Sequence, residues 1–526
     1  MMNRSREQTF TALTGDQGFD LLIVGGGATG LGVALDAAHR GFSVALVEAE
    51  DFAKGTSSRA TKLLHGGVRY LAQGDVPLVR EALHERTTLL ANAPHLAHAL
   101  PFIMPVYGRR GLLFDKWFYG AGLMLYDLLA GKAGLGKTDL LSRARTLEML
   151  PGVRPENLAG GVRYWDGQFD DARLAVGLAR TAERAGACLL NYCRVTDLLH
   201  DSGRVVGAMI RDTIAGRDGR IKARCVINAA GVWVDAIRRM DRPDVQKMVA
   251  PSQGVHIVVD QSFMPGDHAL LVPKTRDGRV LFAVPWLGKL ILGTTDTPRD
   301  DLANEPNPFR EEVEFILGES ARYLQKAPRR EDVLSIWVGL RPLVRPPSDE
   351  GEPTRKLSRE HTVLVAQSGL VTVTGGKWTT YRAMAEDVLD SCARHGLITQ
   401  RAARSTVDLA LVGAPNSQGV PISHPPGLHS YGTDAPTVQA LAGAERELAP
   451  GLTEAMVRFA VRHEYARTVE DVLARRSRLL FLDARLAGSL AGPVSEILAD
   501  ELGADFDARA SCAAFEALAR QYLTLP

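Results

Sequence analysis

Three glycines at fixed spacing lie near the start of the chain, and an acidic residue follows them. Gly25-x-Gly27-x-x-Gly30 comes directly after an apolar run at 19–25, and Glu48 ends a second apolar run. Such glycines let the backbone turn tightly and approach a pyrophosphate, while the carboxylate accepts hydrogen bonds from a ribose. A carboxylate there would also repel a 2′-phosphate. The spacing therefore predicts a site for a dinucleotide that lacks a 2′-phosphate.

Two later glycine turns bear on which dinucleotide binds, because the first turn alone leaves FAD and NAD open. Residues 225–231 read CVINAAG, and Gly375-Gly376-Lys377 follows an apolar run at 363–373. The first resembles the second flavin-contacting turn of FAD oxidoreductases, and the second resembles the late segment that closes on the isoalloxazine ring. Turns so far apart in the sequence indicate FAD, held by a discontinuous domain with a substrate domain inserted into it.

The elements that must position these turns follow from the pattern of apolar residues. A βαβ unit is expected over 19–47, helices over 76–90, 171–185 and 379–395, and strands over 187–199, 204–212 and 220–228. Short alternating runs between 254 and 336 predict a mainly antiparallel sheet, and the stretch from 94 to 167 is expected to be irregular. Residues 440–523 are rich in Ala, Leu and Arg at helical spacing, which predicts a separate helical domain.

The predicted fold class is therefore α/β: a discontinuous Rossmann-like FAD-binding domain, an inserted substrate domain with a mainly antiparallel sheet, and an α-helical C-terminal domain. We expect a mobile leader over 1–18. The FAD-binding domain is expected over 19–90, 171–250 and 346–398, and the substrate domain over 91–170 and 251–345. The helical domain is expected over 399–526.

Composition narrows the classes of function. With 62 basic and 61 acidic residues the formal net charge is +1, which gives no global field for nucleic acid, and no nucleic-acid partner is expected. Five cysteines without a CxxC pair argue against a disulfide framework and a zinc site, so no metal is expected and a reducing compartment is favoured.

The segment 112–129 is the most apolar, yet Asp115, Lys116 and Asp127 interrupt it, so it is not predicted to span a membrane. Two interpretations stay open. It is either a half-buried helix of the substrate domain or an interfacial helix whose basic and aromatic residues meet lipid.

Four motifs together resemble the FAD-dependent glycerol-3-phosphate dehydrogenases of the aerobic, quinone-linked type. They are the run GTSSRATKLLHGGVRYL at 55–71, GTTD at 293–296, GLRPL at 339–343 and GGKWTTYR at 375–382. Their order and spacing match from about residue 19 to 382, and 461–482 is similar to that family's helical cap. The resemblance implies FAD-dependent oxidation of glycerol 3-phosphate to dihydroxyacetone phosphate, by hydride transfer from C2 to flavin N5. Electrons would pass to a membrane quinone or, in some members, to oxygen.

The resemblance also implies residue roles. His256 would be the catalytic base, since a histidine near neutral pKa suits removal of a hydroxyl proton, and Lys377 would stabilise negative charge on the reduced flavin. Arg341 and Arg359 would grip the phosphate, because guanidinium groups bind two oxygens at once. The remaining substrate contacts would be Arg69, Tyr70 and Thr294.

The predicted cofactor contacts come from the glycine turns and from the motif at 55–71. They are Gly25, Gly27, Gly30, Glu48, Thr56, Ser57, Ser58, Lys62, Leu64, His65, Gly66, Gly67, Val195, Ala230, Gly231, Gly376, Lys377 and Thr379.

The chain departs from the family pattern at two positions. Gln253-Gly254-Val255 stands where the family often has Lys-Gly-Ser, which we expect to remove a positive charge near the phosphate site. Trp378 stands where a smaller residue is usual, without a consequence that the sequence reveals.

Two other classes of function remain as alternatives. An amine or amino-acid oxidase of the same fold, using oxygen, would need one arginine for a carboxylate instead of several cations for a phosphate. A non-enzymatic, tRNA-associated flavoprotein is disfavoured by the neutral net charge. We expect a cytoplasmic protein, peripherally attached to the inner face of the cytoplasmic membrane, with a homodimer as one possibility.

Overall fold

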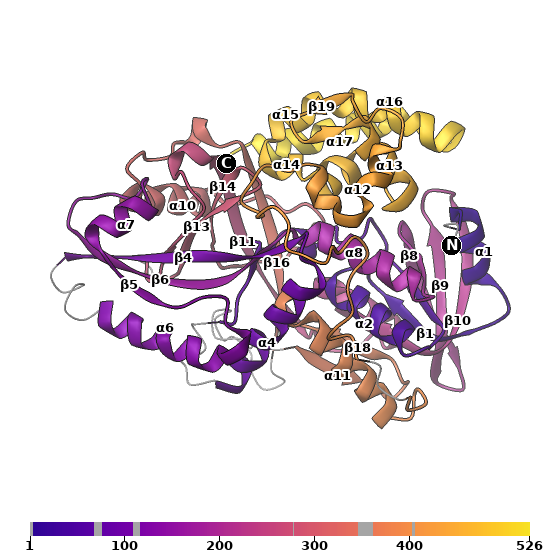
Figure 1. Ribbon diagram of the computed structural model, residues 1–526. Coiled ribbons are helices and arrows are strands. Elements are labelled where there is room, and N and C mark those ends of the chain that lie inside the picture. Colours follow the sequence, from indigo (N-terminus) through magenta and orange to yellow (C-terminus); the bar gives the residue numbers. More distant parts are fainter. Residues whose placement is uncertain (1–3, 68–75, 109–115, 277, 346–360, 402–404) are drawn as a thin grey trace.

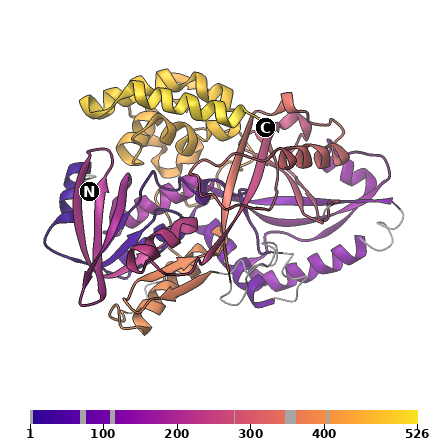
Figure 2. The same ribbon diagram turned by 180° about the vertical axis from the view of Figure 1, so that it is seen from behind.

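The computed structural model describes residues 4–67, 76–108, 116–276, 278–345, 361–401 and 405–526. Figure 1 shows two sheet-containing parts side by side, with the C-terminal helices lying across both of them. The view from behind in Figure 2 shows the same arrangement.

The first sheet carries the dinucleotide turn. Its strands run in the order β17 (Thr362–Val365), β18 (Val371–Thr374), β10 (Arg217–Asn228), β1 (Phe19–Val24), β2 (Val44–Val47) and β7 (Cys188–Leu190). The strands from β18 to β7 are parallel, and β17 pairs antiparallel to β18. Helices α2 (Ala28–His39), α8 (Asp171–Arg184) and α11 (Tyr381–Arg394) share one apolar core with it. The three glycine turns follow β1, β10 and β18, so they meet at one edge of the sheet.

An antiparallel extension, made of β8 (Cys193–Asp201), β9 (Arg204–Asp212) and the first half of β10, carries the N-terminus. The prediction of a mobile leader over 1–18 is wrong for its central part. Residues Arg6–Thr14 form α1, which is capped by Ser5 and buries Phe10 and Leu13 against β7 and β10. The pattern was missed because only two large apolar side chains anchor the helix, and the Arg6–Asp212 ion pair that fixes it (2.7 Å) is not local in sequence.

The second sheet forms the substrate domain. Its strands are β3 (Leu63–Leu64), β4 (Ala97–Tyr107), β5 (Asp139–Ser142), β6 (Leu158–Phe169), β11 (Val249–Asp260), β12 (Ala269–Val272), β13 (Leu281–Trp286), β14 (Lys289–Gly293), β15 (Thr297–Pro298) and β16 (Ser335–Val344). All of its described pairings except β4 with β12 are antiparallel, as predicted. Helices α4 (Val76–Asn92), α6 (Lys116–Ala130), α7 (Arg143–Met149) and α10 (Arg310–Tyr323) surround it.

Two features of this sheet differ from the prediction. The stretch 94–167 contains the long strands β4 and β6, where an irregular segment was expected. The two prolines of β4, Pro101 and Pro105, lack the N–H that a strand ladder uses, which weakens the strand pattern in sequence. Strand β3 pairs with β6, so the predicted FAD-binding segment 19–90 contributes to both sheets.

The C-terminal domain is helical but begins later than predicted. Residues 405–427 contain no helix, and Leu411 from this stretch is buried in the core of the first sheet. Helices α12 (Ala435–Gln439), α13 (Glu454–His463), α14 (Leu479–Leu482), α15 (Ala484–Ser489), α16 (Ala491–Leu502) and α17 (Ala508–Leu523) follow, with a short hairpin of β19 (Glu447–Ala449) and β20 (Leu452–Thr453). The domain shares one core with the second sheet through Trp286, Trp337 and Phe481.

Candidate active site

A cavity of about 510 Å³ lies where the two sheets meet. The ends of β1, β2, β10 and β18 form one wall, and β11 and β16 of the second sheet form another. Among the predicted residues, fourteen line it: Gly25, Gly27, Glu48, Thr56, Ser57, His65, Val195, Ala230, Gly231, His256, Arg341, Gly376, Lys377 and Thr379. Segments separated by hundreds of residues thus converge on one site.

The pyrophosphate end is built from β1, α2 and β2. Gly25, Gly27, Ala28 and Thr29 at the start of α2 line the cavity, where backbone N–H groups and the helix dipole favour an anion. Gly30 lies behind them, because a Cβ there would come within 2.0 Å of the Gly25 carbonyl oxygen. This glycine therefore allows the close contact of helix and strand that the motif predicts.

The ribose end is marked by Glu48. One carboxylate oxygen accepts from the Gly26 N–H at 2.6 Å and the other from the Glu50 N–H at 2.9 Å. Burial raises the pKa of Glu48 above its usual value despite these bonds. Further donors, such as the hydroxyls of a ribose, would favour the ionised form. The site thus suits the adenosine half of FAD.

The loop that follows β2 is tied to the rest of the cavity wall at residues 56 and 57. Ser57 Oγ accepts from the Ala28 N–H at 2.9 Å, and the Thr56 hydroxyl donates to the Leu340 carbonyl. Trp378, which the sequence left without a consequence, donates from Nε1 to the Ser57 carbonyl at 2.9 Å. The large residue after Lys377 therefore holds the backbone of this loop at Ser57.

The reactive end is formed by two neighbouring strands, β11 and β16. His256 is 2% exposed, its ring stacks on Trp337 with centroids 5.2 Å apart, and its Nε2 lies 2.9 Å from Thr61 Oγ1. Burial, with the nearby charges of Arg341 and Lys62, lowers the pKa of His256 well below its ordinary value. The imidazole is consequently neutral at neutral pH and can accept a proton.

Arg341 faces the same cavity from β16. It donates to the Gln253 carbonyl at 3.3 Å and to Thr294 Oγ1 at 3.2 Å, and it forms an ion pair with Asp296 at 3.3 Å. A Cβ on Gly254 would approach its guanidinium to 2.3 Å, so a larger residue there would displace the end of the Arg341 side chain. The side chain is one quarter exposed, which keeps its charge accessible from the cavity.

Comparison with known proteins decides the family. A family model for FAD dependent oxidoreductases matches residues 20–382, and a model for the C-terminal domain of alpha-glycerophosphate oxidase matches residues 427–509. The chain is 42% identical to the mitochondrial glycerol-3-phosphate dehydrogenase of Arabidopsis thaliana, over 94% of this chain and 85% of that protein. It is 40% identical to the human mitochondrial enzyme, over 95% of this chain and 73% of that protein.

The chain belongs to the FAD-dependent glycerol-3-phosphate dehydrogenase family. The crystal structure of the glycerol-3-phosphate dehydrogenase from Bacillus halodurans, which contains FAD, agrees with this. It has a TM-score of 0.78 and 30% identity, covering 99% of this chain and 98% of that one. FAD is the cofactor, and the predicted fold class is confirmed.

Seven of the residues predicted to contact the cofactor or the substrate do not line the cavity. They are Gly30, Ser58, Lys62, Leu64, Gly66, Gly67 and Thr294. Thr294 reaches the site through its bond to Arg341. The prediction that Lys62 contacts the cofactor does not agree with its position. Its ammonium is fully buried, 2.7 Å from Asp171 Oδ2, and burial lowers the pKa of Lys62 to about 7.

Gln253 also differs from its predicted place. Its side chain donates to Glu312 and accepts from Arg299, and it does not line the cavity. The Gln253 side chain therefore belongs to a polar cluster with Glu312 and Arg299, away from the cavity. The predicted substrate residues Arg69, Tyr70 and Arg359 lie outside the described residues.

The sequence reasoning missed two residues that hold His256, namely Thr61 and Trp337. A signal for both was present. Thr61 lies inside the family motif at 55–71, and Trp337 lies two residues before the GLRPL motif. Only the pairing of His256 with Trp337 across β11 and β16 shows why they matter.

Proposed function

We propose that this protein oxidises glycerol 3-phosphate at its secondary hydroxyl to dihydroxyacetone phosphate, with His256 as base. One observation carries the proposal. A buried, neutral histidine and an accessible arginine lie on adjacent strands and line the same cavity as the three glycine turns for FAD. Oxidation of a phosphorylated alcohol needs a base at the hydroxyl and a cation at the phosphate.

The cofactor and the residues of the cavity have separate roles in the proposed reaction. The glycine turns after β1, β10 and β18 would hold FAD, which would supply the two-electron oxidant for the hydride that leaves C2 of the substrate. His256 accepts the hydroxyl proton, and Thr61 and Trp337 hold its ring in place. Arg341 binds phosphate oxygens with its planar fork, positioned by Thr294 and Asp296.

The roles of four further residues are inferred from the family motifs. Lys377, which lines the cavity, supports negative charge near the flavin ring. Arg359 would complete the grip on the phosphate, and Arg69 and Tyr70 would help to hold the substrate.

We also propose that the electrons pass from the reduced flavin to a quinone. The protein would attach peripherally to the inner face of the cytoplasmic membrane. No helix in the described part of the chain is long and apolar enough to span a membrane. Helix α6 supports a surface contact, because Leu128 is 76% exposed and Met124 and Leu125 are nearly half exposed beside it.

An anaerobic titration tests the reaction. Addition of glycerol 3-phosphate to the purified holoenzyme should bleach the oxidised flavin absorbance and yield dihydroxyacetone phosphate, while His256→Gln should bleach far more slowly. An unbleached flavin at saturating substrate would remove the assignment. Bleaching by an amino acid alone would replace it with the amino-acid oxidase alternative.

A further inference from the structure

The loop that follows β2 contributes eight residues to the cavity wall. We call residues 51–62 the cofactor loop, since Ala53–Ser57 and Arg59–Thr61 all line the cavity. Its only regular part is one turn at Thr56–Ser58, so its own hydrogen bonds do not determine its path. Besides the bonds at residues 56 and 57, contacts on the side away from the cavity hold it.

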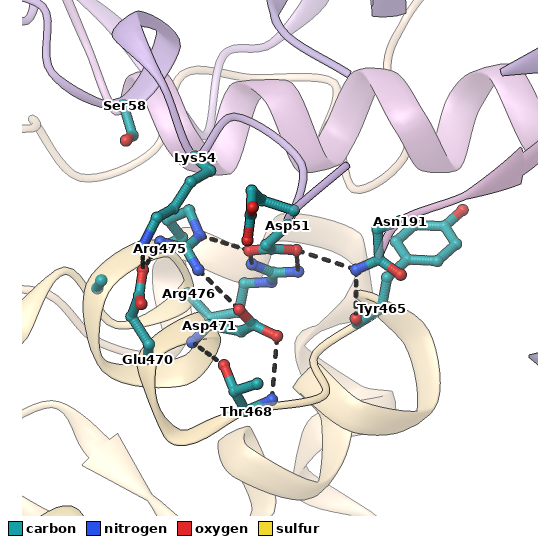
Figure 3. Close-up of polar contacts among 12 residues, drawn as sticks. Asp51, Lys54, Ser58, Asn191, Tyr465, Thr468, Glu470, Asp471, Arg475 and Arg476 are labelled. Atoms are coloured by element: carbon teal, nitrogen blue, oxygen red, sulfur yellow. Dashed lines mark hydrogen bonds and ion pairs between the residues drawn. The ribbon is translucent and has the colours of Figure 1, made fainter. Parts of the chain in front are cut away.

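The first of these contacts is made by Asp51, which is fully buried. Its carboxylate receives bonds from Arg475 and Arg476, both in the π-helical turn Asp471–Arg476 of the C-terminal domain. Asn191 adds a further bond at 3.1 Å, and Figure 3 shows the four side chains converging. Burial would raise the pKa of Asp51, but the two guanidinium groups outweigh it and lower the pKa below the usual range. The carboxylate is therefore charged and depends on the arginines.

The second contact lies three residues along the loop. The Lys54 ammonium is paired with Glu470 of the C-terminal domain, and Glu470 is also paired with Arg475 at 2.6 Å. Figure 3 shows Lys54 reaching down from the loop to Glu470. Lys54 lines the cavity, whereas Glu470 does not.

The third contact holds the end of the turn. Arg478, in a left-handed conformation at the start of α14, donates from Nη2 to the Ser58 carbonyl at 2.9 Å and to Asp171 at 2.9 Å. Lys62 donates to the same carbonyl at 2.6 Å and to the same carboxylate. Arg478 is 1% exposed, so its contact with Ser58 is shielded from solvent.

These contacts share one property. Each joins a charged side chain of residues 470–478 to the outer side of the cofactor loop. None of Glu470, Arg475, Arg476 and Arg478 lines the cavity. A buried charge that loses its partner costs far more than a surface pair, so the two parts are strongly coupled. By contrast, Arg458 and Arg462 pair with Glu501 inside the C-terminal domain.

We propose that Glu470, Arg475, Arg476 and Arg478 form an arginine clamp, which holds the cofactor loop in the conformation that binds FAD. The C-terminal domain is then part of the cofactor site, although it does not contact FAD in the cavity. The coupling is reciprocal, so bound FAD stabilises the clamp as much as the clamp stabilises bound FAD.

Two matched glutamates test the clamp. Glu470→Gln removes the charge that joins Lys54 to Arg475, and Glu501→Gln removes a similar two-cation pair inside the same domain. FAD affinity is measured from the fluorescence of FAD released on serial dilution of each holoenzyme. Glu470→Gln should raise the dissociation constant about tenfold, the loss expected for a charge-assisted bond. Glu501→Gln should leave it within about twofold.

Arg478→Met gives a second arm, with amide hydrogen exchange of residues 51–62 as a readout independent of activity. Exchange should rise in Glu470→Gln and Arg478→Met but not in Glu501→Gln. Should Arg478→Met fail to fold, Glu470→Gln decides alone. Unchanged FAD affinity in Glu470→Gln, or an equal loss in Glu501→Gln, would overturn the proposal.

Discussion

At the scale of single residues, His256 combines complete burial with a neutral ring. Its pKa lies well below the usual value because burial and the charges of Arg341 and Lys62 disfavour the imidazolium. The base is therefore ready at neutral pH, and its protonation should limit turnover only in acid.

Replacement of His256 by Gln should lower kcat by about 10²- to 10⁴-fold with little change in KM, the usual contribution of a general base. In the wild type, kcat should stay level as pH falls from 8 towards the ordinary histidine value of about 6.5 and decline only below it. The variant should lack that acid limb. Stopped-flow rates of flavin bleaching across pH measure both effects, and an identical profile in the variant would exclude His256 as the base.

Arg341 offers a separate test of phosphate recognition. Arg341→Lys keeps the charge but loses the planar fork, so KM for glycerol 3-phosphate should rise about 10- to 100-fold with a smaller change in kcat. Steady-state kinetics measure the two constants, with Arg322→Lys on the exposed face of α10 as the control. An unchanged KM would mean that other cations hold the phosphate.

At the scale of elements, α6 has two opposite faces. Leu123, Tyr126 and Ala130 are buried against the protein, while Leu125 and Leu128 on the other face are exposed. The helix is therefore half-buried, as the first interpretation predicts, and contact of its exposed apolar face with lipid stays a prediction.

Leu128→Glu should weaken binding to phospholipid vesicles about 10- to 100-fold, since burying one leucine contributes roughly 1.5–3 kcal/mol. Co-sedimentation with vesicles measures this, and Val420→Glu, at a residue 37% exposed elsewhere, serves as the control. Equal loss in both variants, or none in Leu128→Glu, would argue against α6 as the membrane contact.

At the scale of the whole molecule, buried ion pairs join the domains and make the assembly sensitive to acid. Burial alone would raise the pKa of Glu470, yet Arg475 and Lys54 lower it to about 2 from an unfolded value of 4.5. The stabilisation is present above pH 4.5 and is lost as pH falls towards 2, because the unfolded chain binds the proton first.

Glu470→Gln should therefore flatten the fall of Tm with decreasing pH below about 4.5. Differential scanning calorimetry between pH 6 and pH 3 measures this slope for the wild type and the variant. A slope as steep in the variant as in the wild type would show that other carboxylates control acid unfolding.

Much of the fold was predictable because the signals are local. The glycine spacing, the apolar runs around it and the helical pattern of the last residues each depend on neighbours in the chain. Strand β4 and helix α1 were missed for the converse reason. Pro101 and Pro105 weaken a strand pattern that β6 completes, and α1 depends on Asp212, far along the chain.

The candidate site divides in the same way. The sequence alone was enough to predict the FAD turn and Glu48, because glycine spacing and chemistry restrict which residues can do these tasks. His256 and Arg341 came from the resemblance to the family and stay predictions. Tertiary structure decided that Lys62 lies behind the cavity, that Gln253 points to Glu312, and that Trp378 holds Ser57. It also decided the contact between residues 51 and 476. Such pairings join residues distant in sequence, and burial, not sequence spacing, sets their charge and their strength.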